Sequence, residues 1–123
     1  MEPSSPSQAE RSAPERCELL LAVTTESSQE RAEAMARALL ELQLVACVSL
    51  RPVRSLYPWQ GRIEDCHEVE LLLKTSPSCL VELRAHVHRL HSYESPQWFS
   101  WRAVATEAYA GWVWAATSSR SDP

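Results

Sequence analysis

Glycine and lysine are both rare in this chain of 123 residues. Gly61 and Gly111 are the only glycines, which excludes the glycine-rich loops that cradle phosphate groups. Lys74 is the only lysine, and with a formal net charge of −4 the chain offers no basic cluster to a nucleic-acid backbone. The sequence also lacks Gly-x-Ser-x-Gly, the motif of one class of catalytic serine. We therefore expect neither an enzyme nor a nucleic-acid-binding protein.

Paired cysteines and long hydrophobic runs are missing as well. The spacing of the cysteines matches neither a zinc site nor a disulfide framework, and they are Cys17, Cys47, Cys66 and Cys79. No apolar stretch approaches the roughly 20 residues that a membrane-spanning helix needs. The first sixteen residues hold no apolar segment of the kind found in a secretory signal. These features favour a cytoplasmic protein without a membrane partner.

The composition of the chain changes abruptly near residue 17. Residues 1–16 are rich in proline, serine and charge, so we expect them to form a disordered N-terminal tail. The chain as a whole is 45% hydrophobic and 23% charged, and its length suits one domain with a single core. We place this domain at residues 17–116, followed by a flexible C-terminal tail at residues 117–123.

The longest strand-like stretch runs over residues 44–75 and predicts an antiparallel hairpin. Its loop is expected around Pro58 and Gly61, since proline fixes φ and glycine tolerates a positive φ. Each arm would hold about 13 residues and span about 40 Å, whereas a compact domain of about 100 residues has a radius of gyration near 13 Å. The tip, with Trp59 and Ile63, should therefore overhang the body and pack against another subunit.

Capping patterns and hydrophobic spacing predict the remaining elements. One helix should begin at the capping box from Ser27 to Glu30, and a second should begin where Ser76 precedes Pro77. Three further elements follow from apolar patterning: a strand at residues 18–25, a strand at residues 97–104 and a short last helix at residues 107–116.

The order strand, helix, strand, strand, helix, strand is that of the ferredoxin-like β-α-β-β-α-β fold. This α+β class has an antiparallel sheet with both helices on one face. The other face then receives no cover from its own chain, because two helices cannot cover all of the apolar strand residues. Examples are Leu20, Ala22, Val48 and Leu72 or Leu73. We expect a second copy of the chain to cover that face.

The polar residues with the best potential for binding lie near the end of the second helix. His88 and His91 are three residues apart, which can place two imidazoles on one side, and Glu94 follows within a turn. The alternative is that histidines at a helix C-terminus only complement its dipole. Lys74 is either a ligand-binding cation or a charge at a strand end. Trp59 is read most simply as an aromatic anchor of a subunit interface.

Several short motifs occur in one register over about residues 18–116. They are Leu44-x-Ala46-Cys47-Val48, Ser55-x-Tyr57-x-Trp59-x-Gly61-x-Ile63-Glu64, Leu73-Lys74-Thr75, His91-x-Tyr93-Glu94-x-Pro96 and Tyr109-x-x-Trp112. Together they closely resemble the CutA divalent-cation-tolerance proteins. The resemblance implies a ferredoxin-like homotrimer whose long hairpins wrap neighbouring subunits, and a link to tolerance of copper and other divalent metals. The family trimers also resemble the PII signalling proteins in architecture, which implies clefts between subunits that bind small ligands.

The chain departs from the family at positions that matter for metal binding. The family turn usually reads His-Pro-Tyr-Glu, whereas Ser92 follows His91 here. A copper site of the family uses a cysteine and two successive histidines, and the matching residues are Thr24, Leu90 and His91. Only His91 keeps the type of side chain that the family site uses.

These considerations lead to one main prediction and one alternative. The main prediction is a metal-tolerance homotrimer that binds copper or zinc weakly at the clefts between subunits, with His91 and Glu94 as metal ligands. The expected walls of the cleft are Cys47, Trp59, Lys74 and Tyr93. The alternative is a PII-like regulatory or scaffolding trimer whose cleft binds a small organic anion through Lys74 and arginines.

Overall fold

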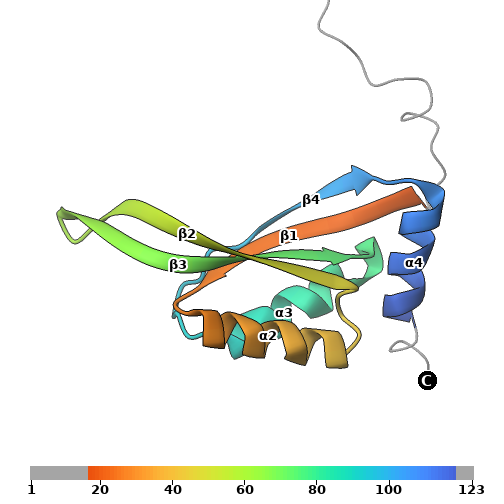
Figure 1. The fold of residues 1–123 in the computed structure, drawn as a ribbon, viewed down its shortest axis with the longest axis horizontal. Helices are drawn as coiled ribbons and strands as arrows, with labels where there is room; N and C mark the ends of the chain where they lie inside the picture. The colour runs from red at the N-terminus through yellow and green to blue at the C-terminus, as the bar shows by residue number, and fades with distance from the viewer. Residues whose placement is uncertain (1–16, 119–123) are drawn as a thin grey trace, which may run out of the picture.

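The computed structural model describes residues 17–118, which form a four-stranded antiparallel sheet and three α-helices (Figure 1). In chain order the elements are β1 (Glu18–Glu26), α2 (Gln29–Glu41), β2 (Cys47–Trp59), β3 (Arg62–Thr75), α3 (Leu80–Leu90), β4 (Phe99–Val104) and α4 (Glu107–Ser118). The predicted α+β class and the predicted order of elements are confirmed. The predicted N-terminal tail and residues 119–123 lie outside the described residues. Within residues 17–118, no helix is long and apolar enough to cross a membrane.

The strands lie in the order β2-β3-β1-β4, and each neighbouring pair is antiparallel. Helices α2 and α3 lie together on one face of this sheet (Figure 1). Alternate residues of the central strands point to that face, among them Ala22 of β1 and Leu71 and Leu73 of β3, all fully buried. They pack with Leu39 of α2 and Leu83 of α3. This layer is the main hydrophobic core.

The hairpin formed by β2 and β3 extends far beyond the rest of the sheet (Figure 1). β3 pairs with β2 along almost its whole length, but it pairs with β1 only from Val69 onward. Residues 53–59 and 62–68 therefore have no third strand beside them, which confirms the predicted overhang. At the tip, Gln60 and Gly61 form a two-residue turn in which φ is 50° and 78°.

The hairpin loop is shorter than the sequence suggested. Pro58, which we expected in the loop, lies inside β2 and pairs with Ile63 of β3. β2 is an edge strand, where a residue without a backbone N–H need not remove a bond from the sheet. Because Gln60 also adopts a positive φ, two residues are enough to reverse the chain.

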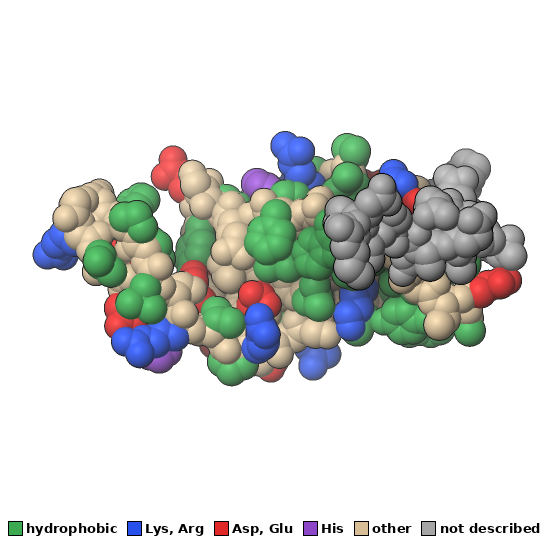
Figure 2. All heavy atoms as spheres, turned by 90° about the horizontal axis from the view of Figure 1, so that it is seen from above, with side chains coloured by type: hydrophobic (Ala, Val, Ile, Leu, Met, Phe, Trp, Pro, Cys, Tyr) green, Lys and Arg blue, Asp and Glu red, His purple; other side chains and the backbone are tan. Residues whose placement is uncertain are grey.

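The face of the sheet turned away from α2 and α3 stays open over its middle. Phe99 and Trp101 of β4 alternate with Ser100, and their rings stack there with centroids 5.9 Å apart while 50% and 43% exposed. Seen from this side, hydrophobic side chains gather over the middle of the molecule and again on the hairpin (Figure 2). Helix α4 covers one end of the face, where Ala110 and Val113 pack against Leu19. The expected open face is therefore confirmed only over its middle, because α4 covers one end. Leu20, Ala22 and Leu73, which we named as examples, are buried.

Four elements begin later than predicted, and one of them is β4, which starts at Phe99 rather than at residue 97. Helix α2 is capped by Ser28, whose side chain accepts from the Arg31 N–H, rather than by Ser27. Helix α3 begins at Leu80, because a 3₁₀ turn, Pro77–Cys79, comes first. Strand β2 begins only at Cys47.

The C-terminal end of the domain lies two residues beyond the predicted one. Helix α4 continues to Ser118, so the prediction of a flexible tail from residue 117 is wrong for its first two residues. The reason is that Thr117 is 2% exposed and its hydroxyl lies 3.0 Å from that of Ser76. This buried contact ties the last turn of α4 to the segment that leads into α3.

Candidate functional site

A buried cluster of polar side chains lies where β1 ends, close to the base of the hairpin. The segment from His91 to Tyr93, which follows α3, folds back against the end of β1 (Figure 1). The His91 side chain has no exposed surface. Its Nε2 lies 3.1 Å from Oγ1 of Thr24, and its Nδ1 lies 3.1 Å from the backbone nitrogen of Tyr93. The structure thus brings together two of the predicted site residues, His91 and Tyr93.

The partners of His91 define how its ring is protonated. A backbone N–H can only donate, so Nδ1 accepts from Tyr93 and carries no proton. In the neutral ring the proton is then on Nε2, which donates to Oγ1 of Thr24. The Nδ1 atom also lies 3.5 Å from Oε2 of Glu26, which is too long for a hydrogen bond. Neither nitrogen is therefore free to bind another group in this arrangement.

Glu26 is the central acid of this cluster, and sequence analysis missed it. The residue is 2% exposed, and its carboxylate accepts from the Ser27 N–H and the Ser92 N–H, both at 3.0 Å, and from the Ser92 hydroxyl at 2.5 Å. Burial alone would raise the pKa of Glu26. The three hydrogen bonds and the nearby His91 outweigh burial, so the pKa lies below its usual value and the group is ionised at neutral pH.

Tyr93 connects the cluster to the overhanging hairpin. Its hydroxyl donates to Oε1 of Glu68 at 2.9 Å, and its ring lies 4.9 Å from that of His91 between centroids. Burial, followed by the hydrogen bond to the Glu68 carboxylate, raises the pKa of Tyr93 well above its usual value. Because Glu68 belongs to the part of β3 without a third strand, Tyr93 supports the hairpin at its base.

The other predicted site residues lie at separate places in one subunit. Cys47 and Lys74 face each other on β2 and β3, where Nζ of Lys74 lies 3.4 Å from the hydroxyl of Ser49. Trp59 lies at the other end of the same strand, about 40 Å away at the usual rise per strand residue. Glu94 is exposed in the turn after Tyr93. A single subunit therefore does not assemble the predicted set.

The described residues of one subunit do not by themselves form a metal site. Among residues 17–118, no three His, Cys, Asp or Glu side chains gather as possible ligands. His88, considered as a partner of His91, is exposed, and its ring instead packs edge-on to Trp98 with centroids 6.0 Å apart. Thr24, which the resemblance matches to a cysteine, offers a hydroxyl, whereas copper(I) prefers thiolate ligands.

Sequence comparison with a family model and with individual proteins points to the same family. The family model described as CutA1 divalent ion tolerance protein matches residues 20–116. The divalent-cation tolerance protein CutA of Archaeoglobus fulgidus is 40% identical over 72 residues, which cover 58% of this chain and 71% of the relative. Protein CutA of Homo sapiens is 36% identical over 106 residues, covering 82% of this chain and 58% of that protein.

Solved structures agree with the sequence comparisons. The structure of CutA from Synechococcus elongatus matches with a TM-score of 0.80 at 32% identity, covering 83% of this chain and 92% of that chain. The structure of the periplasmic divalent cation tolerance protein CutA from Archaeoglobus fulgidus matches with a TM-score of 0.79 at 30% identity, covering 81% and 99%. This chain belongs to the CutA1 divalent ion tolerance family.

Proposed function

We propose that this protein is a cytoplasmic, ferredoxin-like homotrimer that acts in tolerance of divalent metal ions. The observation that carries the proposal is the overhanging hairpin. Leu56, Trp59 and Ile63 are 61%, 58% and 77% exposed on it. An apolar surface of this kind, on a two-stranded ribbon with no third strand beside it, calls for a partner. Packing each hairpin on a neighbouring subunit removes this surface from water. The open sheet face, with Phe99 and Trp101, is a second apolar surface that the same trimer can bury.

Divalent cations, with copper or zinc favoured by ligand type, would bind weakly at the clefts between subunits with His91 and Glu94 as ligands. Glu94 is exposed and lies in the turn that His91 begins. His91 has to give up its bond to Thr24 before Nε2 can bind an ion, and this cost supports weak binding. Because residues 17–118 of one subunit gather no three ligands, the remaining donors would come from a neighbour or from water.

The walls of such a cleft would come from two subunits. Cys47 and Lys74 lie at the body end of the β2-β3 ladder, Tyr93 lies at the base of the overhang, and Trp59 lies at its tip. Within one chain Trp59 is too distant to join the others. Trp59 of a neighbouring subunit can reach the other wall residues, because its hairpin extends from one copy onto the next.

The first experiment is light scattering on the purified protein with and without a chelator. A trimer that persists in chelator supports assembly through the hairpin, whereas a monomer contradicts it. Titration with Cu(II) or Zn(II) then tests the ligands, and His91→Ala should weaken binding about tenfold or more. His86→Ala is the control, because His86 lies on α3 with its Nδ1 bonded to the Glu82 carbonyl. Equal affinities of wild type and His91→Ala would contradict the metal site.

One observation favours the alternative of a regulatory or scaffolding trimer that binds an organic anion. The ammonium of Lys74, the only lysine, pairs with no acid among residues 17–118, and its one described side-chain hydrogen bond, to Ser49, is long at 3.4 Å. An ammonium group so placed is available to a carboxylate or phosphate. A thermal-shift screen of organic anions on wild type and Lys74→Gln separates the two functions, because a bound ligand raises apparent stability.

A further inference from the structure

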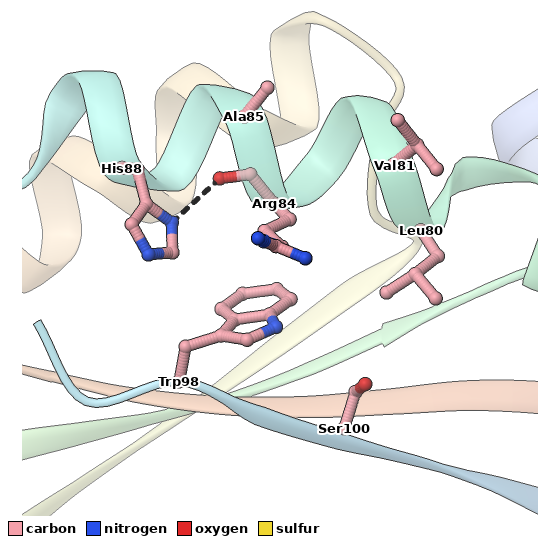
Figure 3. Close-up of a pocket in the computed structure, with 7 residues that line it drawn as sticks. All are labelled: Leu80, Val81, Arg84, Ala85, His88, Trp98 and Ser100. Carbon is pink, nitrogen blue, oxygen red and sulfur yellow. Dashed lines mark hydrogen bonds between the residues drawn. The ribbon is translucent and has the colours of Figure 1, made fainter.

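A groove lies between α3 and β4, and its lining includes none of the residues of the His91 cluster. Its volume is about 560 Å³, within the roughly 300–1,000 Å³ of typical small-molecule sites. Val81, Arg84 and His88 line it from α3, while Trp98 and Ser100 line it from the β4 side (Figure 3). All of these side chains belong to a single subunit.

The polar side chains that line this groove are a guanidinium, an imidazole and a hydroxyl, and none of them is acidic. The exposed guanidinium of Arg84 forms no ion pair with any acid of the described residues, and none of the residues that line the groove is acidic. The Nδ1 of His88 lies 2.9 Å from the backbone oxygen of Arg84 and donates to it, which leaves Nε2 without a partner in the described part of the chain. The Ser100 hydroxyl points into the same space (Figure 3).

Trp98 gives the groove a flat apolar wall. The body of the indole packs partly against the main core, while its ring meets the His88 ring edge-on at 6.0 Å and 63°. In the close-up the indole lies opposite the Arg84 guanidinium (Figure 3). Leu80 and Val81 lie toward the N-terminal end of the same helix. The indole N–H has no acceptor among residues 17–118. An anion held by Arg84 would therefore have an aromatic wall and a free N–H donor beside it.

We propose that the groove between α3 and β4 binds a small aromatic carboxylate, with the carboxylate on Arg84 and the flat ring against Trp98. Arginine recognises carboxylates through two parallel hydrogen bonds, and indole faces stack on flat rings. The absence of acids from the lining removes the repulsion that would oppose such a ligand. This proposal stands independently of metal binding, because it uses neither His91 nor a second subunit.

The test uses 2-naphthoate as the probe and isothermal titration calorimetry on the full chain. Wild type should bind 2-naphthoate, and Arg84→Gln should lose about tenfold or more in affinity, as expected for a charge-assisted bond. Arg89→Gln is the matched control, since Arg89 is an exposed arginine of the same helix that does not line the groove. The neutral 2-naphthalenemethanol should bind more weakly than 2-naphthoate.

Two further measurements keep the result specific to the groove. The indole ¹⁵N–H resonance of Trp98 should shift on addition of 2-naphthoate, and the shift should vanish in Arg84→Gln. His91→Ala should leave 2-naphthoate binding unchanged, which separates failure of this proposal from failure of the metal site. No binding at millimolar probe, or equal losses in Arg84→Gln and Arg89→Gln, would overturn the proposal.

Discussion

Ser92 holds the buried carboxylate of Glu26 with two hydrogen bonds, one from its backbone N–H to Oε2 and one from its hydroxyl to Oε1. Ser92→Ala removes the second bond and leaves the carboxylate with one donor fewer. Since a hydrogen bond to a charged group contributes about 1.5–3 kcal/mol, we expect the free energy of unfolding to fall by that amount. Chemical denaturation at one protein concentration measures this change.

The control for this prediction is Ser95→Ala, because Ser95 is exposed in the same turn. Ser92→Pro should cost more than Ser92→Ala, since proline also lacks the N–H that donates to Oε2. Equal stability of wild type and Ser92→Ala would show that the Ser92 hydroxyl does not hold Glu26.

A second prediction concerns acid stability. The pKa of Glu26 in the folded chain lies below its usual value of 4.5, so its ionised form stabilises the fold. This contribution is present above about pH 4.5 and is lost as the pH falls through the lower, folded-state pKa, because the unfolded chain binds the proton first. Glu26→Gln should remove that part of the pH dependence. Denaturation at a series of pH values down to about pH 3 tests this, and parallel curves for the two proteins would contradict it.

A third prediction concerns the choice of metal. Thr24→Cys places a thiol beside Nε2 of His91, where the Thr24 hydroxyl now lies 3.1 Å from that nitrogen. Because copper(I) prefers thiolate to hydroxyl ligands, we expect affinity for copper(I) to rise about tenfold or more. Thr25→Cys is the control, since neighbouring strand residues point to opposite faces. A similar gain in both variants would mean that the thiol alone, and not its position beside His91, binds the metal.

A fourth prediction separates the hairpin from other exposed apolar surface. Ile63 on the hairpin is 77% exposed and Val81 on α3 is 81% exposed, so the two are matched in accessibility. Ile63→Glu places a charge in the proposed interface and should lower the solution mass measured by light scattering, while Val81→Glu should leave it unchanged. A persistent trimer in Ile63→Glu would exclude the hairpin tip from the interface.

Most of the fold follows from local sequence signals. The long apolar arms of residues 44–75, with Gly61 near their midpoint, predict the hairpin and its overhang. The predicted start of α2 was one residue early, because the successive serines Ser27 and Ser28 offer equivalent caps. The predicted start of α3 was early because Pro77 permits a 3₁₀ turn as well as an α-helix. The end of α4 was missed because the burial of Thr117 depends on Ser76, which lies 41 residues away.

The candidate site was predictable only in part. His91 and Tyr93 stand in a short motif, so the sequence alone identifies them. Glu26 gives one local indication, an acid at the end of the largely apolar strand β1, but its partner Ser92 lies 66 residues away. No local pattern shows that contact. The groove beside Trp98 could not be predicted from the sequence either, because it depends on the distance between α3 and the edge of β4.

The unbroken ladder of the hairpin has a consequence for its reach. Thirteen consecutive residue pairs join β2 to β3, from Cys47 opposite Lys74 to Trp59 opposite Arg62. A single inserted residue in one strand would turn every side chain beyond it to the other face. Related chains with longer or shorter arms should therefore differ by two residues in each strand, moving the tip by about 7 Å per step. The length of the hairpin would then vary among related chains in fixed steps of two residues per strand and not residue by residue.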